Sequence, residues 1–144
     1  MMDKRLSAAF GLKFNPFSSE IPVEGLMARA EVEHFCRRVE SLAREGGFAL
    51  LTGDPGLGKS AALRVLTAHL GAVRDVKVGV LTRPQCRPAD FYREMGDIFG
   101  VNLSPHNKYG GTRLLRERWK EHVDSSLVRP VLIVDEAQEM SLSC

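Results

Sequence analysis

Several features are scarce or missing in this sequence. No stretch approaches the roughly 20 consecutive apolar residues of a membrane-spanning helix, and the N-terminus MMDKRLSAAF lacks the apolar region of a signal peptide. Neither sign of charge dominates, because 20 Lys and Arg face 18 Asp and Glu, and a formal charge of +2 does not by itself indicate nucleic-acid binding. The three cysteines form no CxxC pair, which argues against a zinc site or a disulfide framework. We therefore expect a cytoplasmic protein with reduced thiols.

The composition indicates one folded domain with an irregular start. The chain has 144 residues, of which 44% are apolar and 26% charged, and such a mixture can bury a core. Residues 1–30 combine Gly, Pro and Ser with isolated aromatic residues and show no sustained period. Helical periodicity begins at Glu31. We therefore expect an extended N-terminal segment over residues 1–30 and a folded core over residues 31–144.

Apolar periodicity predicts helices and short buried strands along the core. The expected helices and strands are helices over 31–45, 59–70, 89–99 and 112–127 and strands over 48–52, 76–81 and 131–134. Each strand is a continuous apolar run, which is typical of strands covered on both faces. The order predicts an α/β fold in three layers, with a parallel sheet between two layers of helices.

A glycine-rich loop follows the first expected strand and opens the next helix. Residues 53–60 read GDPGLGKS and match GxxxxGK[ST] in the strand–loop–helix context that this pattern requires. Glycines let the backbone approach phosphate closely, and the helix N-terminus adds positive potential. Lys59 is expected to neutralise the β- and γ-phosphates, and Ser60 to ligate Mg²⁺. The predicted ATP-binding residues are Gly53, Asp54, Pro55, Gly56, Leu57, Gly58, Lys59, Ser60 and Ala61.

An apolar strand that ends in two carboxylates supplies the second half of such a site. Residues 131–134 read VLIV, and Asp135 and Glu136 follow them in a Walker B pattern. Asp135 is expected to bind Mg²⁺, directly or through water, and Glu136 to orient or deprotonate the attacking water. Glu136 and Lys59 are therefore the predicted catalytic residues. The pair of motifs predicts ATP hydrolysis as well as ATP binding.

The last expected helix carries four basic residues, Arg113, Arg116, Arg118 and Lys120. Together they could form a basic face for DNA phosphates. Glu117 and Glu121 are interleaved with them, however, at spacings that stabilise a helix internally. This pattern favours a solvated charged face over a DNA-binding one.

The two motifs together resemble those of the AAA+ ATPases. The loop GDPGLGKS and the strand VLIVDEAQEM carry the resemblance, and FGLKFNPFS ahead of them is similar to the ExeA-type branch, the general secretion pathway A ATPases. Transposition helper ATPases are similar as well. The resemblance covers about residues 10–140, with Leu57 where Thr is more usual. It implies a P-loop NTPase fold and places residues 12–17 near the adenine, whereas packing of Phe14 and Phe17 onto the first helix is the alternative.

The resemblance also implies a gap in the sheet. The family sheet has the strand order five, one, four, three, two, so that strand four separates the Walker B strand from the P-loop strand. The sequence stops nine residues after Asp135 and has no segment for strand four, for the sensor and arginine-finger residues or for the helical lid. We therefore expect a truncated, partial AAA+ core with unpaired strand edges and exposed apolar surface.

Three hypotheses about function remain open at this point. The first is an ATPase that binds ATP with Mg²⁺, forms a homo-oligomer in its full-length form and remodels a partner, either DNA-bound transposition machinery or a secretion complex. The second is a non-catalytic nucleotide-binding or interaction module, and the third is an inactive truncated fragment. A P-loop kinase or a helicase is also compatible with the motifs, because helicases carry sequences similar to DEAQ after an apolar strand. No acceptor site and no further helicase motif accompanies the two motifs, however.

Overall fold

The structure is a computed structural model that describes residues 8–18, 20–27, 29–81, 88–101, 108–125 and 127–140. The main elements of these residues are α2 (Ala30–Glu45), α3 (Lys59–Gly71), β1 (Val76–Leu81), α4 (Pro88–Phe99), α5 (Lys108–Asp124) and β2 (Arg129–Val134). Single turns of 3-10 helix, η1 (Val23–Gly25) and η2 (Ala137–Glu139), precede α2 and follow β2. The helices α2, α3 and α4 and the strand β1 agree with the sequence prediction to within one residue.

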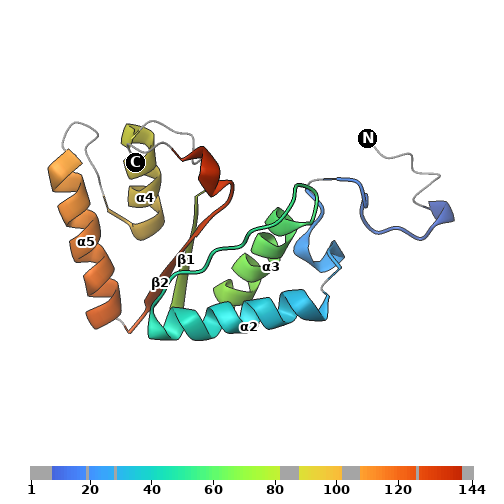
Figure 1. Cartoon of the computed structure of the whole chain (residues 1–144), viewed down its shortest axis with the longest axis horizontal. Helices are drawn as coiled ribbons and strands as arrows, with labels where there is room; N and C mark the ends of the chain where they lie inside the picture. Colours follow the sequence, from blue (N-terminus) through green and yellow to red (C-terminus); the bar gives the residue numbers. More distant parts are fainter. Residues whose placement is uncertain are drawn as a thin grey trace.

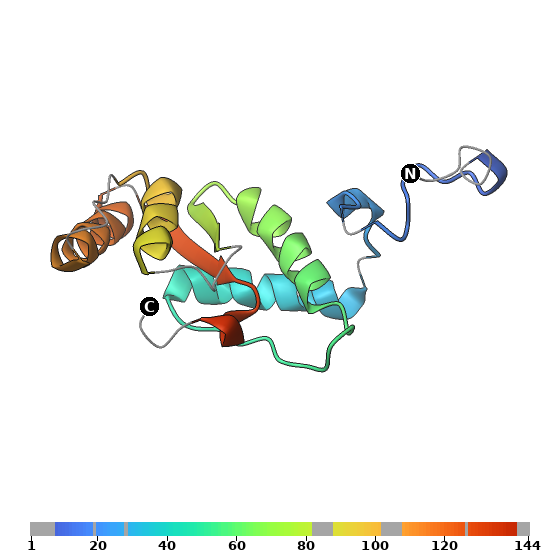
Figure 2. The ribbon, with the colours of Figure 1, turned by 90° about the horizontal axis from the view of Figure 1, so that it is seen from above.

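The two strands form a parallel sheet between helices. Val76 of β1 lies opposite Arg129 of β2, and Leu81 lies opposite Val134. Helices α2 and α3 pack on one face of the sheet, and α4 and α5 lie on the other face (Figure 1; Figure 2 shows the same layers from above). The predicted α/β arrangement, with a parallel sheet between two helix layers, is therefore confirmed.

The larger core lies between the sheet and the layer of α2 and α3. Its buried side chains are Cys36, Leu66, Leu70, Val76 and Ile133. Leu66 and Leu70 lie four residues apart on α3 and therefore share one face of that helix. Burial raises the pKa of the Cys36 thiol, because apolar surroundings disfavour the thiolate. Cys36 thus serves as a small apolar core residue.

A smaller core lies on the opposite face, under α4 and α5. Gly79 of β1 has no side chain, and a Cβ at this position would clash with the side chain of Ile98 on α4. Phe99, at the end of α4, is buried, and its ring meets the ring of Trp119 on α5 edge to face, with centroids 5.3 Å apart. Helix α4 therefore sits directly on the sheet, and α5 packs beside it.

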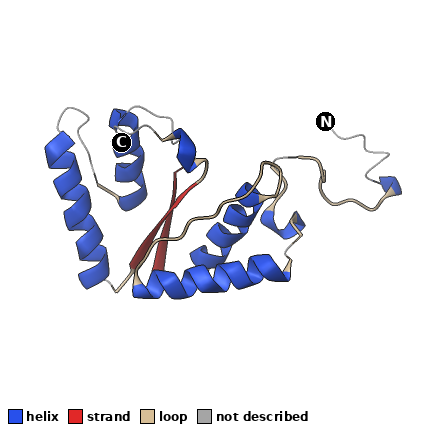
Figure 3. Ribbon diagram, in the orientation of Figure 1, coloured by secondary structure: helices blue, strands red, loops and turns tan. Residues whose placement is uncertain are grey.

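Residues 48–52 do not form a strand, contrary to the sequence prediction. They are irregular chain between α2 and α3, and the side chains of Phe48 and Leu50 are 84% and 71% exposed. Figure 3 draws this stretch as a loop that passes in front of the sheet. A strand needs backbone hydrogen bonds to a neighbouring strand. In the described residues β1 and β2 pair with each other, and no further strand lies beside the stretch to pair with it.

We expect Leu70→Ala to lower the free energy of unfolding by about 2–5 kcal/mol, because the fully buried side chain leaves a cavity in the core. Leu50→Ala is the matched control. Because Leu50 is 71% exposed, its truncation should change the free energy of unfolding by no more than about 0.5 kcal/mol. Chemical denaturation of both variants measures the two values. A cost of several kcal/mol for Leu50→Ala would show that residues 48–52 are buried in solution.

Charged side chains join the ends of α2 and α3. His69 Nε2 lies 2.7 Å from Oε2 of Glu40, and Arg44 donates to Oε1 of Glu40 at 2.9 Å. Arg44 also reaches Asp75, just before β1, at 3.5 Å. The hydrogen bond from Arg44, and then that of His69, lower the pKa of the Glu40 carboxyl group because they favour its charged form. This cluster therefore joins α2 to the C-terminal end of α3, close to the start of β1.

Helix α5 begins at Lys108, four residues earlier than predicted. The sequence prediction begins this helix at Thr112 and leaves Gly110 and Gly111 outside it. In the structure both lie in the first turn of α5, and Gly111 is buried. Gly111 therefore occupies a buried position within a helix, which its low helix propensity does not predict.

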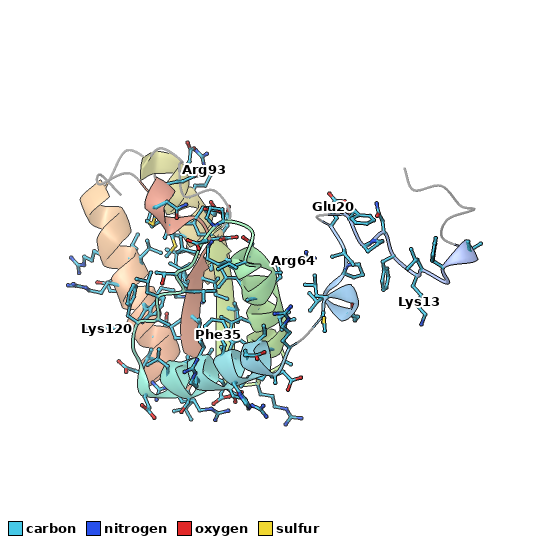
Figure 4. The ribbon with its side chains drawn as sticks, turned by 45° about the vertical axis from the view of Figure 1, so that its right-hand side comes forward. Lys13, Glu20, Phe35, Arg64, Arg93 and Lys120 are labelled. Atoms are coloured by element: carbon cyan, nitrogen blue, oxygen red, sulfur yellow. The ribbon has the colours of Figure 1, made fainter. Side chains whose placement is uncertain are left out.

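The N-terminal segment attaches to the core through α3. Arg64 donates a hydrogen bond to the carbonyl oxygen of Ile21, and Figure 4 shows Arg64 on the side of α3 that faces this segment. Phe14 lies against η1, where a Cβ on Gly25 would be 3.0 Å from its ring. Phe17 is 95% exposed, so the alternative in which this ring packs onto α2 is wrong.

Candidate functional site

The glycine-rich loop leads into α3 through two glycines with positive φ. The φ angle is 83° at Gly56 and 85° at Gly58, values that residues with a Cβ rarely adopt. A Cβ at either position would meet no atom within 4 Å, so the need for glycine here is conformational and not steric. Leu57, between them, is 71% exposed, and its N–H lies 3.4 Å from the carbonyl oxygen of Asp54. The predicted loop thus takes a shape that requires its glycines.

Lys59, the first residue of α3, holds the start of the loop with its ammonium group. Its Nζ donates to the carbonyl oxygens of Gly53 at 2.9 Å and Asp54 at 3.0 Å. An ammonium group has three donors. These two bonds therefore place a positive charge inside the loop and leave a donor for a bound anion.

The N-terminus of α3 presents further donors beside this charge. The first N–H groups of a helix have no carbonyl partner within it. In α3 they belong to Lys59, Ser60 and Ala61, since the N–H of Ala62 already bonds the carbonyl oxygen of Gly58 at 2.9 Å. The N-cap residue Gly58 has no side chain that could occupy these donors. The N–H groups, the helix dipole and Lys59 together favour an anion, so the residues fit the phosphates of a nucleotide.

The acidic residues of the second motif lie where β2 ends. Asp135 is half-buried and Glu136 is exposed. The N–H of Glu136 donates to Oδ1 of Asp135 at 3.0 Å. Glu136 has φ 52° and ψ 41°, a left-handed conformation that ends the strand and begins η2. Both predicted acidic residues are therefore at the carboxyl edge of the sheet, where ligands of parallel α/β folds bind.

The two halves of the site lie on the same edge of the fold. Figure 1 shows the glycine-rich loop at the start of α3 and η2 beyond the end of β2, both on the side where the strands end. Among the described residues, no three His, Cys, Asp or Glu side chains gather at this edge as a metal site.

The structure adds one polar residue that the sequence analysis does not assign. The amide nitrogen of Gln138, in η2, donates a hydrogen bond to Oε2 of Glu136. The signal in the sequence is a glutamine two residues after the predicted catalytic glutamate. Spacing alone does not reveal the contact, because it depends on the left-handed turn at Glu136.

The basic residues of α5 are partly engaged by neighbouring carboxylates. Arg113 pairs with Glu117 at 2.8 Å, and Arg118 pairs with Glu121 at 2.6 Å. The hydrogen bond to Glu117 raises the pKa of Arg113 above its usual value. Pairs at this spacing on one helix support the interpretation of α5 as a solvated charged face.

Comparison with known proteins agrees with this geometry. Residues 42–144, most of the chain, match the family described as AAA domain. The chain belongs to the AAA domain family. Its fold is accordingly a partial P-loop NTPase fold, as the loop, the helix α3 and the parallel pair β1 and β2 indicate. Membership confirms the predictions of a P-loop and of an ATP-binding domain of the ATPase class.

This AAA domain is also similar to a longer protein. It is 31% identical over 135 residues to the general secretion pathway protein A of Aeromonas hydrophila, and the match covers 91% of the chain and 24% of that protein. The AAA domain thus spans about a quarter of the length of this relative. No solved structure matches it. Each helix in its described residues is too short or too polar to cross a bilayer.

Proposed function

We propose that this AAA domain binds ATP with Mg²⁺ at the N-terminus of α3 and, within a complete protein, hydrolyses ATP to remodel a partner complex. The observation that carries the proposal is the Lys59 ammonium group, which the carbonyl oxygens of Gly53 and Asp54 hold beside the free donors of the helix. A fixed cation among several N–H groups suits a chain of phosphates. The family match supports the same ligand.

The residues divide the work of the reaction. Lys59 and the N–H groups of the loop bind the β- and γ-phosphates, while Ser60 and Asp135 would hold Mg²⁺, which would supply positive charge to neutralise the phosphate oxygens. Glu136 accepts a proton from the attacking water, the water oxygen bonds to the γ-phosphorus, and the bond from that phosphorus to the bridging oxygen breaks to give ADP and phosphate.

The partner we propose is a secretion complex in the cytoplasm. The relative is named for general secretion, which favours this partner over transposition machinery. The ion pairs of Arg113 and Arg118 also occupy two of the four basic residues that a DNA-binding face of α5 would use. Since the family resemblance implies that a neighbouring subunit completes the hydrolytic site, we propose a homo-oligomer as the working form.

Thermal unfolding with and without ATP and Mg²⁺ tests the proposal. We expect a cooperative transition whose midpoint rises by several degrees, because a ligand at 100 times its Kd stabilises the folded state by about 2.7 kcal/mol. AMP, which lacks the phosphates that Lys59 binds, is the control and should give little shift. A cooperative transition that ATP does not move would contradict the proposal. A chain without any cooperative transition would favour the inactive-fragment alternative.

A further inference from the structure

Glu136, in the acidic turn after β2, takes part in three local hydrogen bonds. The N–H of Glu136 donates to Oδ1 of Asp135 at 3.0 Å, and the carbonyl oxygen of Glu136 accepts the N–H of Glu139 at 2.9 Å. The third bond joins two side chains, since the amide nitrogen of Gln138 donates to Oε2 of Glu136. The carboxylate that acts on water in the proposed function therefore has one oxygen already bound within the chain.

The backbone at Glu136 makes this third bond possible. Its φ of 52° and ψ of 41° lie in the left-handed region, which residues with a Cβ rarely adopt. Leu127 is the other non-glycine residue with positive φ among the described residues. The single turn η2 follows at once, and its second residue is Gln138. A side chain two positions ahead is thereby brought back to the Glu136 carboxylate.

We propose that Gln138 is a positioning residue for ATP hydrolysis, and this inference rests on the proposed function. The amide of Gln138 restrains Oε2 of Glu136, so that Oε1 remains to accept the proton of the attacking water. The hydrogen bonds of Glu136 through its own N–H and carbonyl oxygen fix the backbone from which the carboxylate extends. All of the restraint on the carboxylate itself comes, in the described residues, from Gln138.

A glutamine suits this role better than a charged residue. Its amide donates a hydrogen bond but carries no charge, so it restrains the carboxylate and leaves the negative charge available to polarise water. A lysine or arginine at position 138 would form an ion pair with Glu136, lower the pKa of its carboxyl group and so make the carboxylate a weaker base. Because Glu136 is exposed, its side chain without the amide would rotate among several conformers.

Gln138→Met is the test variant, because it removes the amide and keeps a side chain of similar length. In the complete protein, where we propose that hydrolysis occurs, we expect kcat to fall at least about tenfold, since a misplaced catalytic group loses reactive geometry. The affinity for ATP should stay within about twofold, because the phosphate loop and Lys59 are unchanged. Glu139→Gln is the matched control, because it changes the next side chain of η2 and leaves the Gln138 amide in place. Its kcat should equal that of the unsubstituted chain.

Nuclear magnetic resonance of the side-chain amides tests the contact without relying on activity. The chain has two glutamines, Gln85 and Gln138, so the loss of one amide signal in Gln138→Met identifies the resonance of Gln138. We expect this resonance to shift when Glu136→Ala removes the acceptor. The control Glu139→Gln should leave it in place.

The outcomes separate the inference from the function on which it rests. An amide resonance that Glu136→Ala does not move, or full kcat in Gln138→Met, would overturn the role of Gln138 while ATP binding and hydrolysis stand. Loss of ATP affinity or of cooperative unfolding in Gln138→Met would assign Gln138 a structural role and overturn the inference as well. If the unsubstituted chain shows a responsive resonance but neither binds nor hydrolyses ATP, the proposed function is refuted and the role of Gln138 with it.

Discussion

Lys59→Ala is expected to weaken ATP binding by about 30-fold or more. Removing one partner of a close charge pair costs roughly 2–5 kcal/mol, and 2 kcal/mol corresponds to about 30-fold in Kd. The variant removes the positive charge from the loop and also frees the carbonyl oxygens of Gly53 and Asp54, which the ammonium group holds at 2.9 and 3.0 Å. Two carbonyl oxygens would then face the phosphates without a cation between them. Calorimetric titration with ATP and Mg²⁺ measures the change.

The control for this variant is Lys120→Ala. Lys120 lies on α5, across the sheet from α3, and Figure 4 shows it on the far side of the molecule from Arg64. The Lys120→Ala variant should change the net charge by the same amount as Lys59→Ala and leave the affinity for ATP unaltered. Unfolding of both variants should remain cooperative, because hydrogen bonds to partly exposed groups contribute only about 1 kcal/mol to stability. Unchanged affinity in Lys59→Ala would overturn the assignment of the loop as the phosphate site.

The local features of the site could be predicted from the sequence because short-range chemistry determines them. The glycines at positions 56 and 58 adopt positive φ, the helix begins at Lys59, and the carboxylates follow directly after β2. Each of these follows from what one residue type can do at one backbone position. The family match confirms the class of site. The individual roles of Lys59, Ser60, Asp135 and Glu136 remain predictions.

The irregular structure of residues 48–52 could not be predicted from those residues alone. A run of apolar residues between glycines favours a buried strand. A strand forms, however, only where a neighbouring strand supplies backbone hydrogen bonds. Phe48 and Leu50 are exposed because no other strand in the described chain lies beside them. The resemblance to the AAA+ ATPases contained the relevant information, since it places strand four between the two motifs.

The contact between Gln138 and Glu136 also could not be predicted from the sequence. It requires the left-handed backbone of Glu136, which is unusual for a glutamate and which no local pattern specifies. Similarly, the attachment of the N-terminal segment depends on Arg64 meeting the carbonyl oxygen of Ile21, 43 residues earlier in the chain. The first contact depends on an unusual backbone conformation, and the second depends on two segments that are far apart in the sequence. Neither arrangement can be recognised from the sequence pattern.

Glu136→Gln is expected to leave ATP binding within about twofold and to lower the rate of hydrolysis by about 10²–10⁴-fold, the usual contribution of a general base. The amide oxygen of the new glutamine can still accept the hydrogen bond that Gln138 now donates to Oε2 of Glu136, so the turn after β2 should keep its shape. The substitution therefore removes the proton acceptor and little else. Single-turnover hydrolysis of labelled ATP, at concentrations above the Kd, measures the loss.

The matched control for this last prediction is Glu139→Gln, which makes the same chemical change three residues further on. Both variants lose one negative charge at the same edge of the fold, so a general electrostatic effect on ATP or Mg²⁺ would appear in both. A large loss confined to Glu136→Gln assigns proton transfer to that carboxylate. Equal losses in the two variants would mean that charge near the phosphates, and not a general base, sets the rate. Full hydrolysis in Glu136→Gln would move the base to another residue and leave Asp135 with the metal alone.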